Sequence, residues 1–144
     1  MKRLIAALCL MAGPAVADFV HVEAEGSVEE VTDRLEAAVE GAGATVFARV
    51  DHGGGAASVD MELPPAELLI FGNPMLGTPA MQADMRAGLM LPLRVLVAEI
   101  DGQTHLLYED VAGMMEGLDV PLDAEFATKM GGALANLTGA AAMP

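Results

Sequence analysis

His52 is the residue of this 144-residue sequence whose position best suits acid–base chemistry. It ends a predicted strand and is followed by Gly53-Gly54-Gly55, a flexible run beside which a side chain could face a pocket. An imidazole titrates near neutral pH, so His52 could act as a general base or contact a ligand. The alternative is a structural histidine that donates to a nearby backbone carbonyl.

A loop rich in helix-start signals lies in the middle of the chain. Asn73-Pro74 is a turn-forming pair, while Thr78-Pro79 has the pattern of an N-cap followed by proline at the first helical position. The exposed amides and dipole of such a helix N-terminus attract carboxylates or phosphates. Asn73 and Thr78 are therefore candidate ligand-binding residues. They could equally be an ordinary turn former and cap, since no P-loop lysine or complete G-x-G-x-x-G pattern accompanies them.

Arg94 and Tyr108 are further candidates, placed on the two strands of a predicted hairpin. Asp101-Gly102 between the strands favours a two-residue type I′ turn, which pairs residues whose numbers sum to 203. Arg94 then lies opposite Glu109, and could form a cross-strand ion pair or bind a ligand. Tyr108 could line a pocket or pack half-buried. Both hairpin faces are largely apolar, so we expect both to be covered.

Other chemistries find less support. His21 and His105 lie on separate strands, and three histidines would have to converge to bind zinc. Nine methionines follow residue 17, without M-x-x-M repeats, which favours packing over copper binding. The chain has no G-x-S-x-G motif. We therefore predict neither a metal nor a cofactor.

The N-terminus has the pattern of a secretion signal. Lys2-Arg3 precedes a short apolar stretch and the sequence Ala15-Val16-Ala17, which predicts cleavage near Ala17 and a signal peptide over residues 1–17. The remaining chain carries 5 basic and 21 acidic side chains, a net charge of −16, and no cysteine. This composition excludes disulfides and thiolate chemistry and argues against binding to nucleic acids or anionic membranes. A bacterial periplasm, or secretion, is the expected location.

Residue periodicity predicts a single α+β domain over residues 18–144, with a four- to five-stranded, mostly antiparallel sheet packed by helices. The order is strand, helix, strand, strand, helix, hairpin, helix. A capping box at Ser27 to Glu30 predicts the first helix. Residues 53–66 are expected to be mostly irregular, because Gly and Pro disfavour helix there. The predicted strands are residues 19–24, 45–52, 67–72, 93–100 and 103–110, and the helices are residues 28–42, 79–88 and 121–137, with a short one at 112–117.

Three segments resemble the family known as domain of unknown function 302. They are residues 71–74 (FGNP), 77–82 (GTPAMQ) and 88–95 (GLMLPLRV), with an aspartate–histidine step at Asp51-His52 upstream. The resemblance spans about residues 20–137. It implies a small α+β domain, often exported and prone to self-association, with no established activity. The sequence departs from the family at Gly53–Gly55, where an alanine-rich helix is usual, and at Val111, where proline is common.

These observations lead to three functional hypotheses. The first is a non-enzymatic domain, acting as a homodimer, that binds a small and possibly anionic molecule between His52, Asn73, Thr78, Arg94 and Tyr108. A second is a hydrolase- or lyase-type enzyme with His52 as general base. The third is a structural homodimerisation module.

Overall fold

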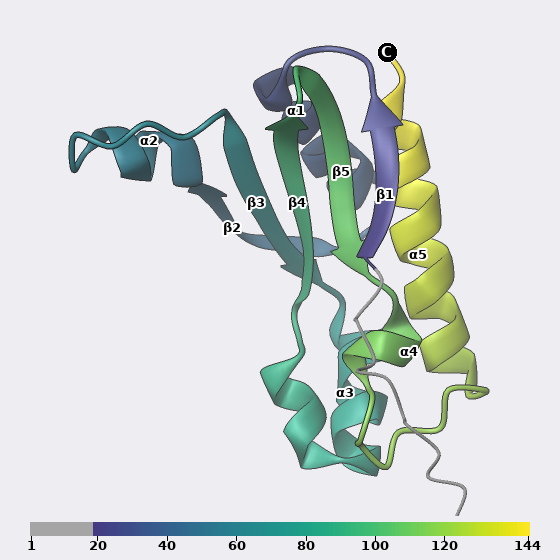
Figure 1. The fold of residues 1–144 in the computed structure, drawn as a ribbon. Coiled ribbons are helices and arrows are strands. Elements are labelled where there is room, and N and C mark those ends of the chain that lie inside the picture. Colours follow the sequence, from purple (N-terminus) through teal and green to yellow (C-terminus); the bar gives the residue numbers. More distant parts are fainter. Residues whose placement is uncertain (1–18) are drawn as a thin grey trace, which may run out of the picture.

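A computed structural model of the protein describes residues 19–144, so the predicted signal peptide lies outside the described residues (Figure 1). This part of the chain contains both strands and helices. Its strands are β1 (Phe19–Ala24), β2 (Thr45–Asp51), β3 (Ala66–Gly72), β4 (Leu93–Ile100) and β5 (Gln103–Glu109). Its helices are α1 (Val28–Gly41), α2 (His52–Ala57), α3 (Pro74–Ala83), the 3-10 helix η1 (Met85–Leu89), α4 (Val111–Met114) and α5 (Glu125–Ala142).

The five strands form one antiparallel sheet in the order β1-β5-β4-β3-β2, which confirms the predicted α+β fold. The β4–β5 hairpin turns at Asp101 and Gly102, whose φ angles of 53° and 80° suit a type I′ turn. Val97 lies opposite Leu106, as the turn predicts. β1 and β2 occupy the two edges.

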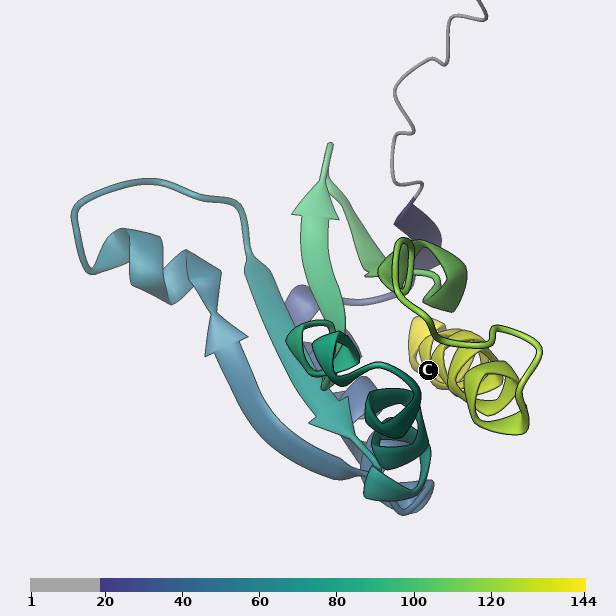
Figure 2. The ribbon, with the colours of Figure 1, turned by 90° about the horizontal axis from the view of Figure 1, so that it is seen from below.

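Helices α1 and α5 pack against one face of the sheet (Figure 2). The first turn of α1 is closed by the predicted capping box, in which the Ser27 amide donates to Glu30 Oε2 at 2.8 Å. The apolar stripe of this helix is buried, with Leu35 fully inaccessible. Alternate residues of the central strands, including Leu69, Val95 and Leu106, meet these helices and form the core. Other fully buried members are Val31, Val39, Phe71, Val97, Met130 and Leu134.

The opposite face of the sheet differs from the prediction. We expected both faces of the hairpin to be covered. Instead, Leu96 and Leu107, which are paired on this face, are only half-buried, as are Leu68 and Ile70 on β3. The apolar residues on this face predicted that another layer would bury it, but α1 and α5 both pack against the other face. We call this surface the open face.

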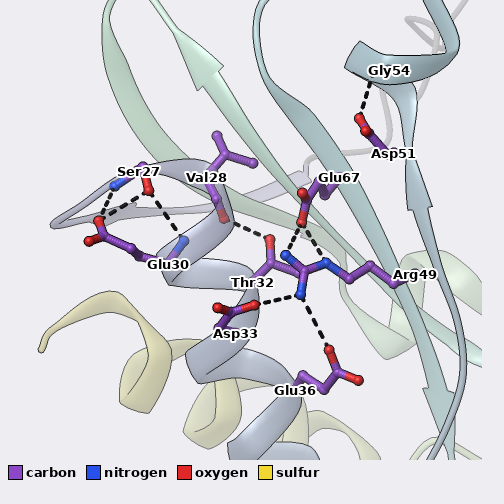
Figure 3. A network of polar contacts seen from close by, with 10 residues as sticks. All are labelled: Ser27, Val28, Glu30, Thr32, Asp33, Glu36, Arg49, Asp51, Gly54 and Glu67. Atoms are coloured by element: carbon purple, nitrogen blue, oxygen red, sulfur yellow. Dashed lines mark hydrogen bonds and ion pairs between the residues drawn. The ribbon is translucent and has the colours of Figure 1, made fainter.

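Arg49 joins β2 to the helical layer (Figure 3). Its guanidinium contacts Asp33 on α1 at 2.6 Å and Glu67 on β3 at 2.7 Å, and Glu36 lies at 3.4 Å. Hydrogen bonding to these carboxylates raises the pKa of Arg49 against the opposing effect of partial burial. The ion pairs tie three elements together at the edge of the sheet.

Two helix predictions require correction. The central helix begins at Pro74 rather than residue 79, because Asn73-Pro74 already supplies the N-cap and first helical position, leaving Pro79 inside the helix. Residues 52–57 form α2 instead of an irregular segment. Asp51 caps this helix by accepting a 2.7 Å hydrogen bond from the Gly54 amide, which compensates for the poor helix propensity of glycine.

The last predicted helix starts at Glu125 and not at Pro121, because residues 121–124 form a turn. Figure 1 shows α5 running along the β1 edge of the sheet. None of the helices described for residues 19–144 combines the length and apolar character that crossing a membrane requires.

Candidate functional site

The five predicted site residues do not meet in one pocket. Asn73 and Thr78 line a pocket at α3, whereas Arg94 and Tyr108 line a second pocket on the sheet. His52 is exposed at the start of α2, next to the β2 edge, and lines neither of these pockets. Four of the five candidates therefore line two separate pockets, a separation that the sequence did not indicate.

The first pocket, here called the α3 pocket, has a volume of about 310 Å³. This is at the lower end of the range for small-molecule sites. Its wall combines α3, the loop entering β4, the bulged start of β2 and one residue of α5. The lining residues are Phe47, Gly72, Asn73, Pro74, Leu76, Gly77, Thr78, Met81, Leu91, Pro92, Leu93 and Met130.

The chemistry of the α3 pocket is mainly apolar. Asn73 and Thr78 provide its polar side chains, and no lining residue carries a charge. The Asn73 carboxamide oxygen accepts a 2.9 Å hydrogen bond from the Met75 amide, and the NH₂ group remains free to donate to a ligand. The Thr78 hydroxyl makes no hydrogen bond to another described residue.

The expected anion site at the helix N-terminus lacks free donors. Pro74 has no N–H, and the Met75 amide is used by the Asn73 side chain. The amides of Leu76 and Gly77 both donate to the Asn73 carbonyl oxygen, at 2.9 and 3.0 Å. With its first four amides absent or engaged, this helix start has little to offer a carboxylate or phosphate.

A second pocket, of about 330 Å³, lies where β1, β3, β4, β5 and α4 approach one another on the open face. It is lined by Phe19, Leu68, Arg94, Leu96, Leu107, Tyr108, Glu109 and Met114. Among residues 19–144, Arg94 is the cation with neither an ion pair nor a side-chain hydrogen bond, since Arg34 donates to the Ala141 carbonyl and the other three cations form ion pairs. The cross-strand ion pair expected between Arg94 and Glu109 is not formed.

A compact polar cluster fixes the turn between α3 and η1. The Asp84 carboxylate accepts bidentate hydrogen bonds from the Arg86 guanidinium, the shortest at 2.6 Å. It also accepts hydrogen bonds from the backbone amides of Arg86 and Asp119. These donors hold the pKa of Asp84 well below its usual range. The cluster anchors the segment 116–120 against the end of α3 and is structural.

Sequence reasoning missed most of the wall of the α3 pocket. Leu76, Met81 and Met130 have the spacing of ordinary core residues, and Phe47 belongs to a strand whose register shifts at a bulge between residues 46 and 48. The available signal was the clustering of motif segments, since nine of the twelve lining residues belong to segments 71–74, 77–82 and 88–95. No group of three or more potential metal ligands is found within residues 19–144.

Comparison with known proteins places this fold in a defined family. The model of the family described as "Domain of unknown function DUF302" matches residues 20–139. A crystal structure of an uncharacterised conserved DUF302 protein from Bacillus stearothermophilus superposes with a TM-score of 0.74 at 20% sequence identity. The superposition covers 85% of this chain and 97% of that chain, so the two folds agree over nearly the whole domain.

Curated relatives share more sequence but are longer. Proteins named "Fluoride-specific ion channel FluC 1" from Brucella suis and Brucella abortus are each 41% identical over 111 residues, which is 76% of this chain. A protein named FluC 2 from Brucella melitensis matches equally well. The matched segment spans only 41 to 44% of these relatives.

Proposed function

This chain belongs to the DUF302 family, and from that starting point we propose that it binds a small, mainly apolar molecule in the α3 pocket. The observation that carries the proposal is the convergence of the family's motif segments on one cavity. Residues 71–74, 77–82 and 88–95 are separated along the chain, yet they form three quarters of the pocket wall. A shared surface for the three segments is what a binding site requires.

The wall selects the chemistry of the ligand. Apolar side chains such as Leu76 and Leu91 favour a hydrocarbon or aromatic body, because burying apolar surface contributes about 25 cal/mol per Å². The Asn73 NH₂ group can donate to one ligand acceptor, and the Thr78 hydroxyl can donate or accept. The engaged helix amides and the absence of a cation from the lining oppose an anion.

Binding without catalysis fits this wall best. The lining residues include no carboxyl, imidazole, thiol or amine that could move a proton. The enzyme hypothesis would need a substrate beside His52, but that residue is exposed and lines neither the α3 pocket nor the pocket on the open face. We accordingly place the ligand at α3 and assign no reaction to His52.

A matched pair of fluorescent molecules tests the proposal. N-phenyl-1-naphthylamine is neutral and apolar, whereas its 8-sulfonate derivative has the same aromatic body with a negative charge. We expect the neutral dye to bind with one-to-one stoichiometry and at least tenfold more tightly than the sulfonate. Thr78→Trp, at an exposed position on the pocket rim, should weaken that binding while leaving the circular dichroism spectrum unchanged. Binding unaffected by Thr78→Trp would refute the assignment of the site.

Export to the periplasm or medium is part of the proposed role, because the signal pattern over residues 1–17 predicts it. Cell fractionation with mass determination of the mature protein tests this location. A product that starts near Asp18 in the exported fraction would support it. Full-length protein confined to the cytoplasm would contradict it.

Self-association is a second candidate role, and the open face favours it. Leu68, Leu96 and Leu107 leave an apolar strip half-exposed, in a chain whose sequence predicted cover for that strip. Arg94 and Glu109 border the strip without pairing with each other. A second copy related by a twofold axis would cover the leucines and could bring Arg94 of one molecule to Glu109 of the other.

Sedimentation of matched charge variants tests the dimer. Leu96→Glu introduces a carboxylate in the strip and should give a monomer. The control Ala37→Glu adds the same charge at an exposed position of α1 and should remain dimeric. A monomeric wild-type protein at tens of micromolar concentration would refute this role.

A further inference from the structure

Two histidines that are 84 positions apart in the sequence meet on the open face of the sheet. His21 on β1 lies opposite Leu107, and His105 on β5 lies opposite Glu23, so the two histidines are diagonal neighbours on adjacent antiparallel strands. Their ring centroids are 6.3 Å apart and the ring planes cross at 76°. Diagonal side chains at this spacing can share a ligand.

His105 carries an unexplained polar atom. Its Nδ1 atom is buried and has no hydrogen-bond partner among the described residues. Such an atom costs about 1 to 3 kcal/mol when it stays unsatisfied, and orphaned buried groups often mark an ion, a water molecule or a functional role. An ion or a water molecule bound at this nitrogen would satisfy it.

We propose that His21 and His105 together bind a divalent transition-metal ion, with one ring nitrogen each. Zn²⁺, Ni²⁺ and Cu²⁺ all accept imidazole ligands. With metal–nitrogen bonds of about 2.1 Å, two imidazoles on one metal have centroids roughly 4.5 to 6.5 Å apart, depending on the ligand angle. The observed centroid separation of 6.3 Å lies inside this range. If the two rings moved about 1 Å closer, the nitrogen–metal–nitrogen angle would be tetrahedral.

The surroundings of the pair define the type of site. Glu23 faces His105 across the strands and is two residues from His21, so it lies on the same face and can accept a hydrogen bond from a metal-bound water molecule. Because no third protein ligand joins the two histidines in the described chain, water molecules complete the coordination. The site is consequently exchangeable and differs from a closed structural zinc site.

His52 is excluded from this site by topology. It directly follows β2, which forms one edge of the sheet, whereas β1 forms the other edge. His52 therefore serves as the matched control, being the third histidine of the same protein at an exposed position. The proposal shares no residue with the α3 pocket, so either proposal can fail alone.

Isothermal titration of the purified, metal-free protein with ZnCl₂ tests the pair. Excess Mg²⁺ in the buffer occupies sites made only of carboxylates, because Mg²⁺ prefers oxygen ligands. We expect one Zn²⁺ per chain with micromolar affinity, weakened at least tenfold by His21→Gln and unchanged by His52→Gln. His105→Gln should also weaken binding, and thermal melting verifies that each variant is folded.

Three results would overturn the proposal. The first is no zinc binding by the wild-type protein in the presence of Mg²⁺. The second is equal zinc affinity of His21→Gln and the wild type. The third is an equal loss in His52→Gln, which would indicate unspecific binding to the acidic surface.

Discussion

The substitution Gly77→Ala separates ligand binding from stability in the α3 pocket. Gly77 is the fourth residue of α3 and lines the pocket. A Cβ atom added there would lie 3.5 Å from Leu91 Cδ1, which is ordinary van der Waals contact. The new methyl group therefore fits the folded protein but occupies space that a ligand would use.

The two effects of this substitution have opposite signs. Replacing glycine by alanine inside a helix stabilises it by about 0.5 to 1 kcal/mol, because alanine has less backbone entropy to lose. For a domain of this size, that gain corresponds to a rise in melting temperature of roughly 2 to 5 °C. Forcing one extra methyl group into a filled site costs about 1 to 3 kcal/mol, so the affinity for N-phenyl-1-naphthylamine should fall about tenfold.

Thermal melting and dye titration on the same samples measure both effects. Gly132→Ala is the matched control, since Gly132 lies inside α5, is exposed and has no atom within 4 Å of an added Cβ. It should raise the melting temperature similarly and leave dye affinity unchanged. If Gly77→Ala were stabilised and bound the dye as tightly as wild type, the dye would not occupy the α3 pocket. If both variants lost affinity equally, the loss would not come from the pocket wall.

Two further predictions concern the polar contacts. Arg49→Ala should lower the free energy of unfolding by about 1 to 2 kcal/mol, because it leaves three carboxylates together without their cation. Partial exposure of the guanidinium limits the effect to this size. Urea unfolding measures the change, and a loss no larger in Arg49→Ala than in Arg49→Lys would contradict the role of the forked hydrogen bonds. Asp84→Asn should lower the melting temperature by a few degrees at pH 7. The pKa of Asp84 is depressed in the folded state, so its stabilisation is present above the unfolded pKa of about 4 and is lost as the pH falls below that value. The difference between Asp84→Asn and wild type should therefore narrow in melting curves below pH 4, and a difference that stays constant or widens there would contradict this origin.

The parts of the fold that the sequence predicted correctly are those with local causes. The Ser27 capping box depends on residues three apart, and the Asp101-Gly102 turn depends on two neighbours with positive φ. Once the turn is known, the pairing of β4 with β5 follows without knowledge of the rest of the molecule. Such features do not depend on long-range contacts, so they can be predicted from the local sequence.

The arrangement of the candidate site residues was harder to predict, because it depends on the order of the strands in the sheet. Arg94 and Tyr108 lie on the adjacent strands of the predicted hairpin, whereas His52 lies at the opposite edge from β1. The local sequence does not indicate which strands lie at the edges of the sheet. The same limit explains the missed pairing of His21 with His105, which follows only from β1 packing beside β5.

The proposed binding role would explain why the motif segments of the α3 pocket include residues outside the core. Residues that only stabilise a fold are expected in the core, as Leu93 is, with 5% of its surface exposed. Asn73 and Leu91, however, are half-buried, while Thr78 and Pro92 are exposed, and all four border the cavity. A wall assembled from three separate segments and left open to solvent buries less apolar surface than the same segments could bury by closing on each other. An occupant that fills the pocket would recover that burial, and this is the physical reason to look for a ligand there first.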